Sequence, residues 1–159
     1  MEQPSQQNPT WPCKYIWKCR IPYKVSCVTW LLAKEVTLTQ DNIMERVIML
    51  CSRCSLCGET SESVKHLFPY CKYTPQLWRV FFSLEGISWT MPRRVTKALK
   101  TWEEADVHSK DRVRWKIIPT SIWWAIQKER NSRCFESIEN IVHKVKLNCI
   151  LLLCFWCNQ

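Results

Sequence analysis

A cluster of cysteines around one histidine constrains this chain more than any other feature. Residues 51–71 read CSRCSLCGETSESVKHLFPYC and hold four cysteines and one of the three histidines of the 159-residue chain. Thiolates and imidazole are the usual ligands of structural zinc sites. The first question about the fold is therefore which of these side chains bind one ion.

Spacing divides the cluster into two halves of a metal site. Two thiolates separated by two residues, as in Cys54-x2-Cys57, can face one ion, and Gly58 lets the backbone turn so that amides point at sulfur. His66-x4-Cys71 supplies the other half. Three cysteines and one histidine form a closed set with no position for water, so such a site organises the fold and does not catalyse.

Alternatives remain open on spacing alone. Cys51-x2-Cys54 has the same interval, and we favour Cys57 as the partner of Cys54 because glycine follows it. A run of buried or idle free cysteines would give the same letters. A short helix is expected after Ser63; Pro69 should end it, so that the loop beyond can bring the last cysteine round to the ion.

Composition and periodicity favour helices around this centre. The chain has only 2 glycines but 10 tryptophans, which argues against a turn-rich sandwich. Apolar spacing predicts helices over 22–33, 39–50, 74–86, 92–102, 111–131 and 137–156. We predict a mainly α fold: a small irregular helical domain organised round a Cys3His zinc knuckle, with a C-terminal helical extension. The expected divisions are a disordered lead-in (1–13), a zinc-binding domain (14–90) and a helical extension packed on it (91–159).

Single residues refine these helices. Thr74 can cap the helix at 74–86 and Gly86 can terminate it. Pro119 should kink or split the helix at 111–131, because its ring removes a backbone donor and clashes with the preceding turn. The large aromatic side chains on apolar helix faces are expected to be core residues; they are Trp78, Trp123 and Trp124.

Charge and leader composition suggest the compartment and the partners. The net charge of +9 favours polyanions such as nucleic acid. No secretory leader is recognisable, and the longest apolar run, 149–157, is about half of what a bilayer needs. We expect an intracellular protein in a reducing compartment, nucleus or cytoplasm, with no membrane partner.

Catalytic patterns are not found in the sequence. It shows no paired aspartates for two Mg²⁺ ions, no RNase H-like set of acids and no glycine-rich phosphate loop. The acidic loop at 103–111, EEADVHSKD, is not expected to be a site, because its acidic residues are crowded in one loop. His108 is expected to be solvated and His143 to lie on a helix face. Cys154-x2-Cys157 ends an apolar helix and is expected to be core or tail, since reactive pairs lie at helix amino termini.

The segments around the cysteines resemble a known family. They are IWKCRIPYKVSCVTWLLAKEVTLTQDNI, CSLCGETSESVKHLFPYCKYTPQLW and FFSLEGISWTMP, with a tail like WWAIQKERNSRCFE. They resemble the zinc-binding domain that follows the polymerase in plant non-LTR (LINE-type) retrotransposon reverse transcriptases. The resemblance implies Zn²⁺ bound by Cys54, Cys57, His66 and Cys71, with Cys51 outside the set. Two positions depart from the family pattern: Pro69 before the last ligand, and Cys27 at a typically aromatic position.

The resemblance also implies handling of RNA or target DNA. Basic and aromatic side chains near the metal could contact phosphates and unpaired bases; the candidates are Arg53, Lys65, Tyr70, Lys72, Tyr73, Arg79, Arg93 and Arg94, with Lys97 and Lys100 beyond them. The alternative is a detached retroelement remnant that at most docks on protein, such as a reverse transcriptase polymerase region, through its apolar tail. Both interpretations describe a protein that is not an enzyme.

Overall fold

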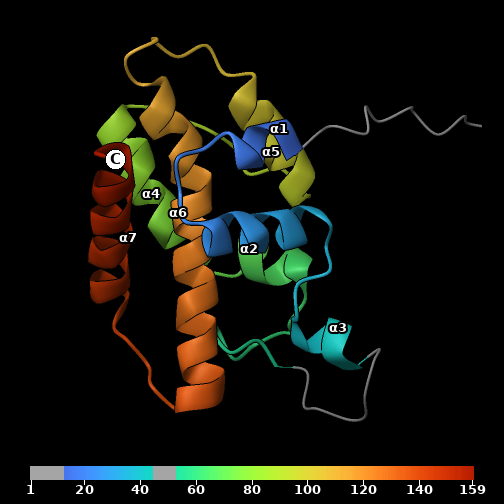
Figure 1. The fold of residues 1–159 in the computed structure, drawn as a ribbon. Coiled ribbons are helices and arrows are strands. Elements are labelled where there is room, and N and C mark those ends of the chain that lie inside the picture. The colour runs from blue at the N-terminus through green and yellow to red at the C-terminus, as the bar shows by residue number, and fades with distance from the viewer. Residues whose placement is uncertain (1–12, 45–52) are drawn as a thin grey trace, which may run out of the picture.

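The computed structural model describes residues 13–44 and 53–159, and that part of the chain is mainly helical (Figure 1). Its α-helices are α1 (Cys13–Trp17), α2 (Tyr23–Ala33), α3 (Gln40–Met44), α4 (Thr74–Glu85), α5 (Val95–Glu103), α6 (Arg112–Asn131) and α7 (Val142–Cys157). Two π-helical turns, η1 (His66–Tyr70) and η2 (Ser132–Glu136), complete the described elements. Within these residues the β-pairing consists of one isolated bridge, Arg53 with Ser61. The predicted fold class is confirmed.

Three predictions fall largely or wholly outside the described residues. They are the disordered lead-in of residues 1–13, the second half of the helix expected to start at Thr39, and the exclusion of Cys51 from the metal site.

Most expected helices are present, with shifted ends. Helix α4 ends where predicted, since Gly86 closes it in a left-handed conformation at φ +63°. The predicted cap by Thr74 is wrong: the Thr74 hydroxyl donates instead to the carbonyl of Leu67 at 2.8 Å. Helix α7 starts at Val142, later than expected, because Ser137 is left-handed (φ +55°) and ends the preceding turn. The chain reverses there and returns along α6 (Figure 1).

Helix α6 is the centre of the molecule. It packs against α7 on one side and against α2 on the other, and it also contacts α4 and α5 (Figure 1). Twelve of its twenty residues are buried, so it has no wide solvent face. A single cluster of buried apolar side chains includes residues from both sides of position 90.

Of the predicted kink or split at Pro119, the split is not observed, since Arg112–Asn131 is one helix. A proline leaves the carbonyl four residues earlier without its helical donor. In this fold the indole Nε1–H of Trp102 donates to that carbonyl, on Trp115, at 2.7 Å. The Tyr15 hydroxyl donates to the next carbonyl, on Lys116, at 2.9 Å. The indole from α5 thus replaces the one donor that Pro119 lacks, and the hydroxyl from α1 adds a bond to the neighbouring carbonyl.

Tryptophan rings form the core around α6. Trp78 and Trp123 are 2% and 1% exposed, which confirms their predicted burial. The Trp78 ring lies 5.4 Å from Trp102 and 6.3 Å from Trp123, both edge-to-face, the arrangement that aromatic quadrupoles favour. Trp124 is only half-buried, and the Lys24 ammonium lies over its ring at 5.6 Å.

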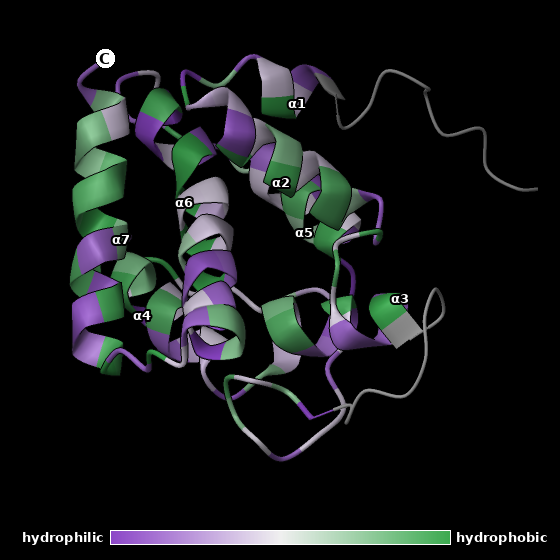
Figure 2. Ribbon diagram, turned by 60° about the horizontal axis from the view of Figure 1, so that its bottom comes forward, coloured by the Kyte–Doolittle hydropathy of each residue, from purple (hydrophilic) through white to green (hydrophobic). Residues whose placement is uncertain are grey.

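Helix α7 changes character along its length. Figure 2 shows hydrophilic residues in its first turns and hydrophobic ones towards its C-terminal end. Cys154 is exposed and Cys157 half-buried at that end, where burial raises the pKa of the Cys157 thiol. His143 on α7 and His108 in the 103–111 loop are both exposed. None of the helices in the described ranges is long and apolar enough to cross a membrane.

Candidate metal centre

The structure brings together the four side chains that spacing favoured and that the resemblance implied as ligands. The ligand atoms of Cys54, Cys57, His66 and Cys71 all lie within 4.8 Å of one another. Thiolates at two vertices of a tetrahedron with 2.3 Å metal bonds lie about 3.8 Å apart. The Sγ atoms of Cys54 and Cys71 are 3.8 Å apart, and Cys57 Sγ lies 3.3 Å from His66 Nε2. These residues therefore fit a single tetrahedral ion.

A tight loop positions the first two ligands. The amide of Cys54 donates to the carbonyl of Thr60 at 2.7 Å, and the Gly58 amide donates back to the Cys54 carbonyl at 2.8 Å. Gly58 is left-handed at φ +69°, a conformation that costs a side-chain-bearing residue energy. The loop thereby turns the Cys57 side chain back towards that of Cys54.

A widened helical turn positions the other two ligands. The Ser63 hydroxyl accepts from the His66 amide at 3.0 Å and starts the turn. The helix then opens into the π-helical turn η1, in which the Cys71 amide donates to the His66 carbonyl at 2.6 Å. Pro69 lies buried inside this turn and does not end it, contrary to the prediction. The turn ends one residue later, and its width brings Cys71 back to His66.

Thr60 contacts the imidazole beside the ligand atom. Its hydroxyl lies 3.1 Å from His66 Nδ1 and also 3.1 Å from Nε2. With Nε2 facing Cys57, Nδ1 can carry the proton and donate to this hydroxyl. Such outer contacts orient a ligating histidine and fix its tautomer.

The two buried thiols affect each other's protonation. The hydrogen bond between them lowers the pKa of the Cys54 thiol and raises the pKa of the Cys71 thiol. Backbone amides of Cys57 and Leu56 also lower the pKa of Cys54. One thiolate is thus favoured and the second opposed, so a set of three thiolates needs added positive charge. A divalent cation at the centre would supply it.

A buried carboxylate ties the ligand loops to α6. Glu62 is fully buried and its Oε1 accepts from Arg130 Nη2 at 2.8 Å and Nε at 3.1 Å. Its Oε2 accepts from the Ser55 hydroxyl at 3.0 Å, and the Gln40 amide also donates to Oε1 at 3.1 Å. The carboxylate is therefore bonded from α3, the cysteine loop and α6 at once.

The turn after α6 continues this contact. Arg133 Nη1 donates to the carbonyl of Leu56 at 3.2 Å, and Cys134 Sγ lies 2.8 Å from the Ser55 hydroxyl. Glu129 holds Arg133 in place through an ion pair of 2.7 Å. We call the side chains of Glu129, Arg130, Arg133 and Cys134 the α6–η2 clamp.

The α6–η2 clamp was not identified as part of the site from sequence. Its residues follow the ligands by about sixty positions or more and carry no metal-ligand pattern. Both regions nevertheless belong to segments already named in the sequence: ERNSRC lies in the segment WWAIQKERNSRCFE, and Glu62 lies in CSLCGETSESVKHLFPYCKYTPQLW.

The basic side chains proposed for nucleic acid lie on the surface. Those found exposed are Arg53, Lys65, Lys72, Arg79, Arg93, Arg94, Lys97 and Lys100. Two of them are paired: Lys72 with Glu59, and Arg94 with Glu35 at 3.8 Å.

The two tyrosines of the predicted set differ. Tyr70 is 50% exposed, so its ring is accessible for stacking. Tyr73 is 4% exposed, and the Arg133 guanidinium covers its ring at 5.3 Å. Because its ring is enclosed, Tyr73 does not present a face on which a base could stack.

A second basic group was missed in the sequence. Lys18, Arg20, Arg112 and Lys116 line one cavity of about 260 Å³ between the turn after α1 and the start of α6. Within the described part of the chain none of these four cations forms an ion pair. They are distant in sequence, so no local charge run marks them.

Comparison with known proteins agrees with this geometry. No curated protein and no solved structure matches the chain. Residues 1–78 match the family model described as zinc-binding in reverse transcriptase, and this range includes all four ligands. The matched model describes the zinc-binding part of a reverse transcriptase and not its catalytic part. The match and the Cys3His cluster together fit a zinc-binding module of a reverse transcriptase.

Proposed function

We propose that Cys54, Cys57, His66 and Cys71 bind one Zn²⁺ ion and that this ion is structural. The observation that carries the proposal is the closed set of four ligands within 4.8 Å. Zinc favours four-coordinate sulfur and nitrogen sites, and a set with four protein ligands leaves no position for a reacting water. The module is accordingly non-catalytic.

Metal content tests the zinc site. The purified protein should carry about one zinc per chain, and Cys57→Ser should lower that content and open residues 50–75 to proteolysis. Cys154→Ser is the matched control, because this thiol is exposed on α7. Cys51→Ser is the second control and should leave the content unchanged. Equal zinc loss in Cys51→Ser and Cys57→Ser would contradict the ligand assignment.

We further propose that the module derives from a plant non-LTR retrotransposon and binds RNA or DNA through its basic helices. The net charge of +9 and the exposed basic side chains support the binding of nucleic acid. The cavity of Lys18, Arg20, Arg112 and Lys116 adds four cations that are not neutralised by ion pairs within the described residues. Tyr70 offers a ring on which an unpaired base could stack.

Salt dependence tests nucleic-acid binding. For a single strand, the slope of log K against log salt is about −0.7 per phosphate neutralised, so four contacts give about −3. Lys116→Gln with Arg112→Gln should make this slope shallower by about 1.4. Glu104→Gln is the control for surface charge. A zinc-loaded protein that binds single strands weakly and without a salt slope would contradict the proposal.

A second candidate function, docking on protein, is favoured by the surface of α7. Leu147, Leu151 and Phe155 on this helix are 51%, 57% and 60% exposed. In this alternative the chain is a detached retroelement remnant that docks on a reverse transcriptase polymerase region or another protein. Leu151→Lys should then abolish capture of that partner while oligonucleotide binding stays weak and insensitive to the change.

A further inference from the structure

No aromatic side chain is among the described residues that line the cavity of Lys18, Arg20, Arg112 and Lys116, which we call the cationic cavity. Proteins that hold unpaired bases stack them on aromatic rings. The volume of about 260 Å³ is also below the range of about 300–1,000 Å³ that is usual for drug-sized ligands. The cationic cavity therefore suits a small anionic group better than a base.

Positive charge is concentrated in the cationic cavity. Its described lining has four cations and no carboxylate, which gives a charge of +4. One carboxylate, on Glu103, lines the adjoining cavity together with Arg112 and Lys116, so the two cavities together carry +4 − 1 = +3. Like charges held this close repel one another, and an anion between them removes that repulsion.

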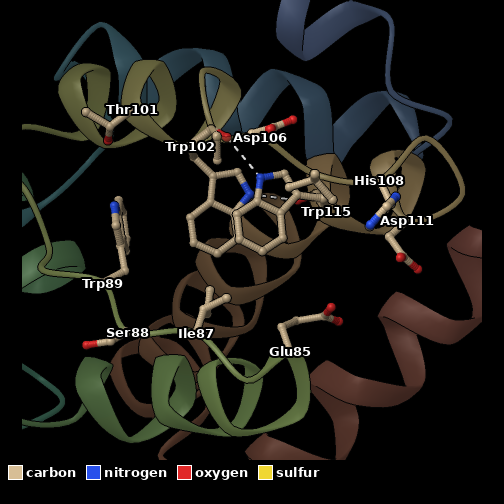
Figure 3. Close-up of a pocket in the computed structure, with 12 residues that line it drawn as sticks. Glu85, Ile87, Ser88, Trp89, Thr101, Trp102, Asp106, His108, Asp111 and Trp115 are labelled. Carbon is tan, nitrogen blue, oxygen red and sulfur yellow. Dashed lines mark hydrogen bonds between the residues drawn. The ribbon is translucent and has the colours of Figure 1, made fainter.

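Other acidic side chains of this region belong to a different pocket. Figure 3 shows Glu85, Asp106 and Asp111 around that pocket. Arg114 pairs with Glu85 at 2.9 Å and with Asp111 at 3.1 Å. None of these three carboxylates is among the described residues that line the cationic cavity, so they do not close it with negative charge.

The turn after α1 is fixed to α6 and adds no negative charge to the cationic cavity. Burial raises the pKa of the Cys19 thiol to about 11, so this lining residue stays protonated at neutral pH. Its Sγ donates to the Tyr15 carbonyl at 3.3 Å, and the Ile21 amide donates to the Cys19 carbonyl at 3.0 Å. The Tyr15 hydroxyl in turn donates to the Lys116 carbonyl on α6 at 2.9 Å. These bonds order the backbone of the turn in advance, which lowers the entropic cost of binding a ligand there.

The charge and the size of the cationic cavity select a class of anion. An internal phosphodiester carries one negative charge, whereas a phosphate monoester carries about −1.5 to −2 at pH 7 and has three oxygens that accept hydrogen bonds. Guanidinium and ammonium groups bind such oxygens through strong, charge-assisted hydrogen bonds. We propose that the cationic cavity binds a phosphate monoester, and that this group is the terminal phosphate of a nucleic-acid strand. The choice of a strand end as the source rests on the proposed nucleic-acid binding.

Strands that differ only at their ends test the proposal. Three versions of one internally labelled single strand carry a 5′-phosphate, a 3′-phosphate or neither, and fluorescence anisotropy measures their binding to the zinc-loaded full chain. At least one phosphorylated strand should bind about tenfold tighter than the strand without a terminal phosphate. Equal binding of all three strands with a clear salt slope would overturn the inference and leave nucleic-acid binding intact.

Adenosine 5′-monophosphate, with adenosine as its control, distinguishes the source of the phosphate. In calorimetric titrations the mononucleotide should bind more weakly than the phosphorylated strand, because it lacks the other contacts of the strand, and adenosine should not bind. Tighter binding of the mononucleotide would overturn the strand end as the source and assign the cavity to a free small molecule. If no strand binds, nucleic-acid binding fails, and absence of mononucleotide binding would then overturn the phosphate site as well.

Paired variants locate the effect in the cationic cavity. Arg112→Gln with Lys116→Gln should remove the preference for the phosphorylated strand. Lys18→Gln with Arg20→Gln, from the turn after α1, should do the same, so the test does not depend on one helix. Retention of the preference in both paired variants would overturn the proposal.

A matched pair of cations outside the lining is the control. Arg93 and Lys97 are exposed and do not line the cationic cavity. Arg93→Gln with Lys97→Gln should weaken the binding of all three strands similarly, because it removes the same formal charge, and should leave the preference for a terminal phosphate unchanged. Loss of the preference in this control as well would show that general surface charge causes it and would overturn the assignment.

Discussion

The metal centre and the tryptophan core are stabilised by different kinds of contact. Around the ligands, the buried side chains include a full carboxylate–guanidinium pair, Glu62 with Arg130. Around α6, the buried side chains are large rings such as Trp78, Trp102 and Trp123. The stability gained from apolar packing increases gradually, because each buried methylene or ring contributes free energy in proportion to its area. The stability of a buried ion pair is lost in one step, because removing either partner leaves the other charge buried and uncompensated.

The difference implies that the two regions fail differently. The ligand loops, residues 53–73, depend on a few directional bonds and on the charge of a cation. The core depends on many contacts, none of which is indispensable. Loss of the metal should therefore unfold the loops while the core around α6 persists.

Metal removal is the change with the largest expected effect. A chelator should abolish hydrogen-exchange protection of the amides of residues 53–73, because zinc contributes about 10–16 kcal/mol of binding energy in small zinc peptides. Amides of α4 and α6 should remain protected. Simultaneous loss of protection in both regions would show that they form one cooperative unit and would contradict the comparison.

Breaking the buried ion pair should have the next largest effect. Arg130→Met leaves the Glu62 carboxylate buried without its partner, which typically costs about 3–5 kcal/mol. Denaturant unfolding of the zinc-loaded protein measures this loss. Arg114→Met is the matched control, because the Arg114 side chain is 46% exposed and its pair with Glu85 is expected to contribute about 1 kcal/mol. Adding Glu62→Leu to Arg130→Met should recover part of the loss.

Trp102→Phe should destabilise the core by a smaller amount. The variant loses the indole N–H that donates to the Trp115 carbonyl. Pro119 has no N–H to replace it, so a buried acceptor stays unpaired at a cost of about 1–3 kcal/mol. Pro119→Ala in the same background restores a backbone donor and should recover stability. If Pro119→Ala stabilises the wild type and the Trp102→Phe variant equally, the indole does not replace the helical donor.

The exposed pair near the ligands should have the smallest effect. Glu59 and Lys72 both lie in solvent, where ion pairs contribute little. Glu59→Gln should leave the melting temperature and the zinc content unchanged. A clear loss of zinc in this variant would show that the surface of the ligand loops, and not only their buried bonds, holds the metal.

Much of the local structure could be predicted from the sequence. Ligand spacing favoured Cys54, Cys57, His66 and Cys71 over a set with Cys51, the resemblance implied the same four, and the fold brings them together. Apolar periodicity located α4 and α6, and Gly86 closes α4 as its conformational freedom predicts. These features depend on residues within a few positions of one another, so a single sequence contains them.

What could not be predicted depends on distant side chains. From sequence alone Pro119 predicts a helix break, because the bond from the Trp102 indole to the Trp115 carbonyl is not visible there. From sequence alone the α6–η2 clamp is interpreted as a charged helix end, because the contact of Arg130 with Glu62 is not visible there. From sequence alone Tyr73 is a candidate for base stacking, because the Arg133 guanidinium that covers its ring lies sixty residues later. Each outcome was decided by a partner from another element.

The distance in sequence between Glu62 and Arg130 has a consequence for synthesis of the chain. The guanidinium is 68 residues later than the carboxylate, so at roughly 5–20 residues per second it is added about 3–14 s afterwards. All four ligands leave the ribosome before their clamp exists. We expect ion capture to come first and α6 to lock it, so chains stalled before residue 130 should exchange zinc faster than released protein.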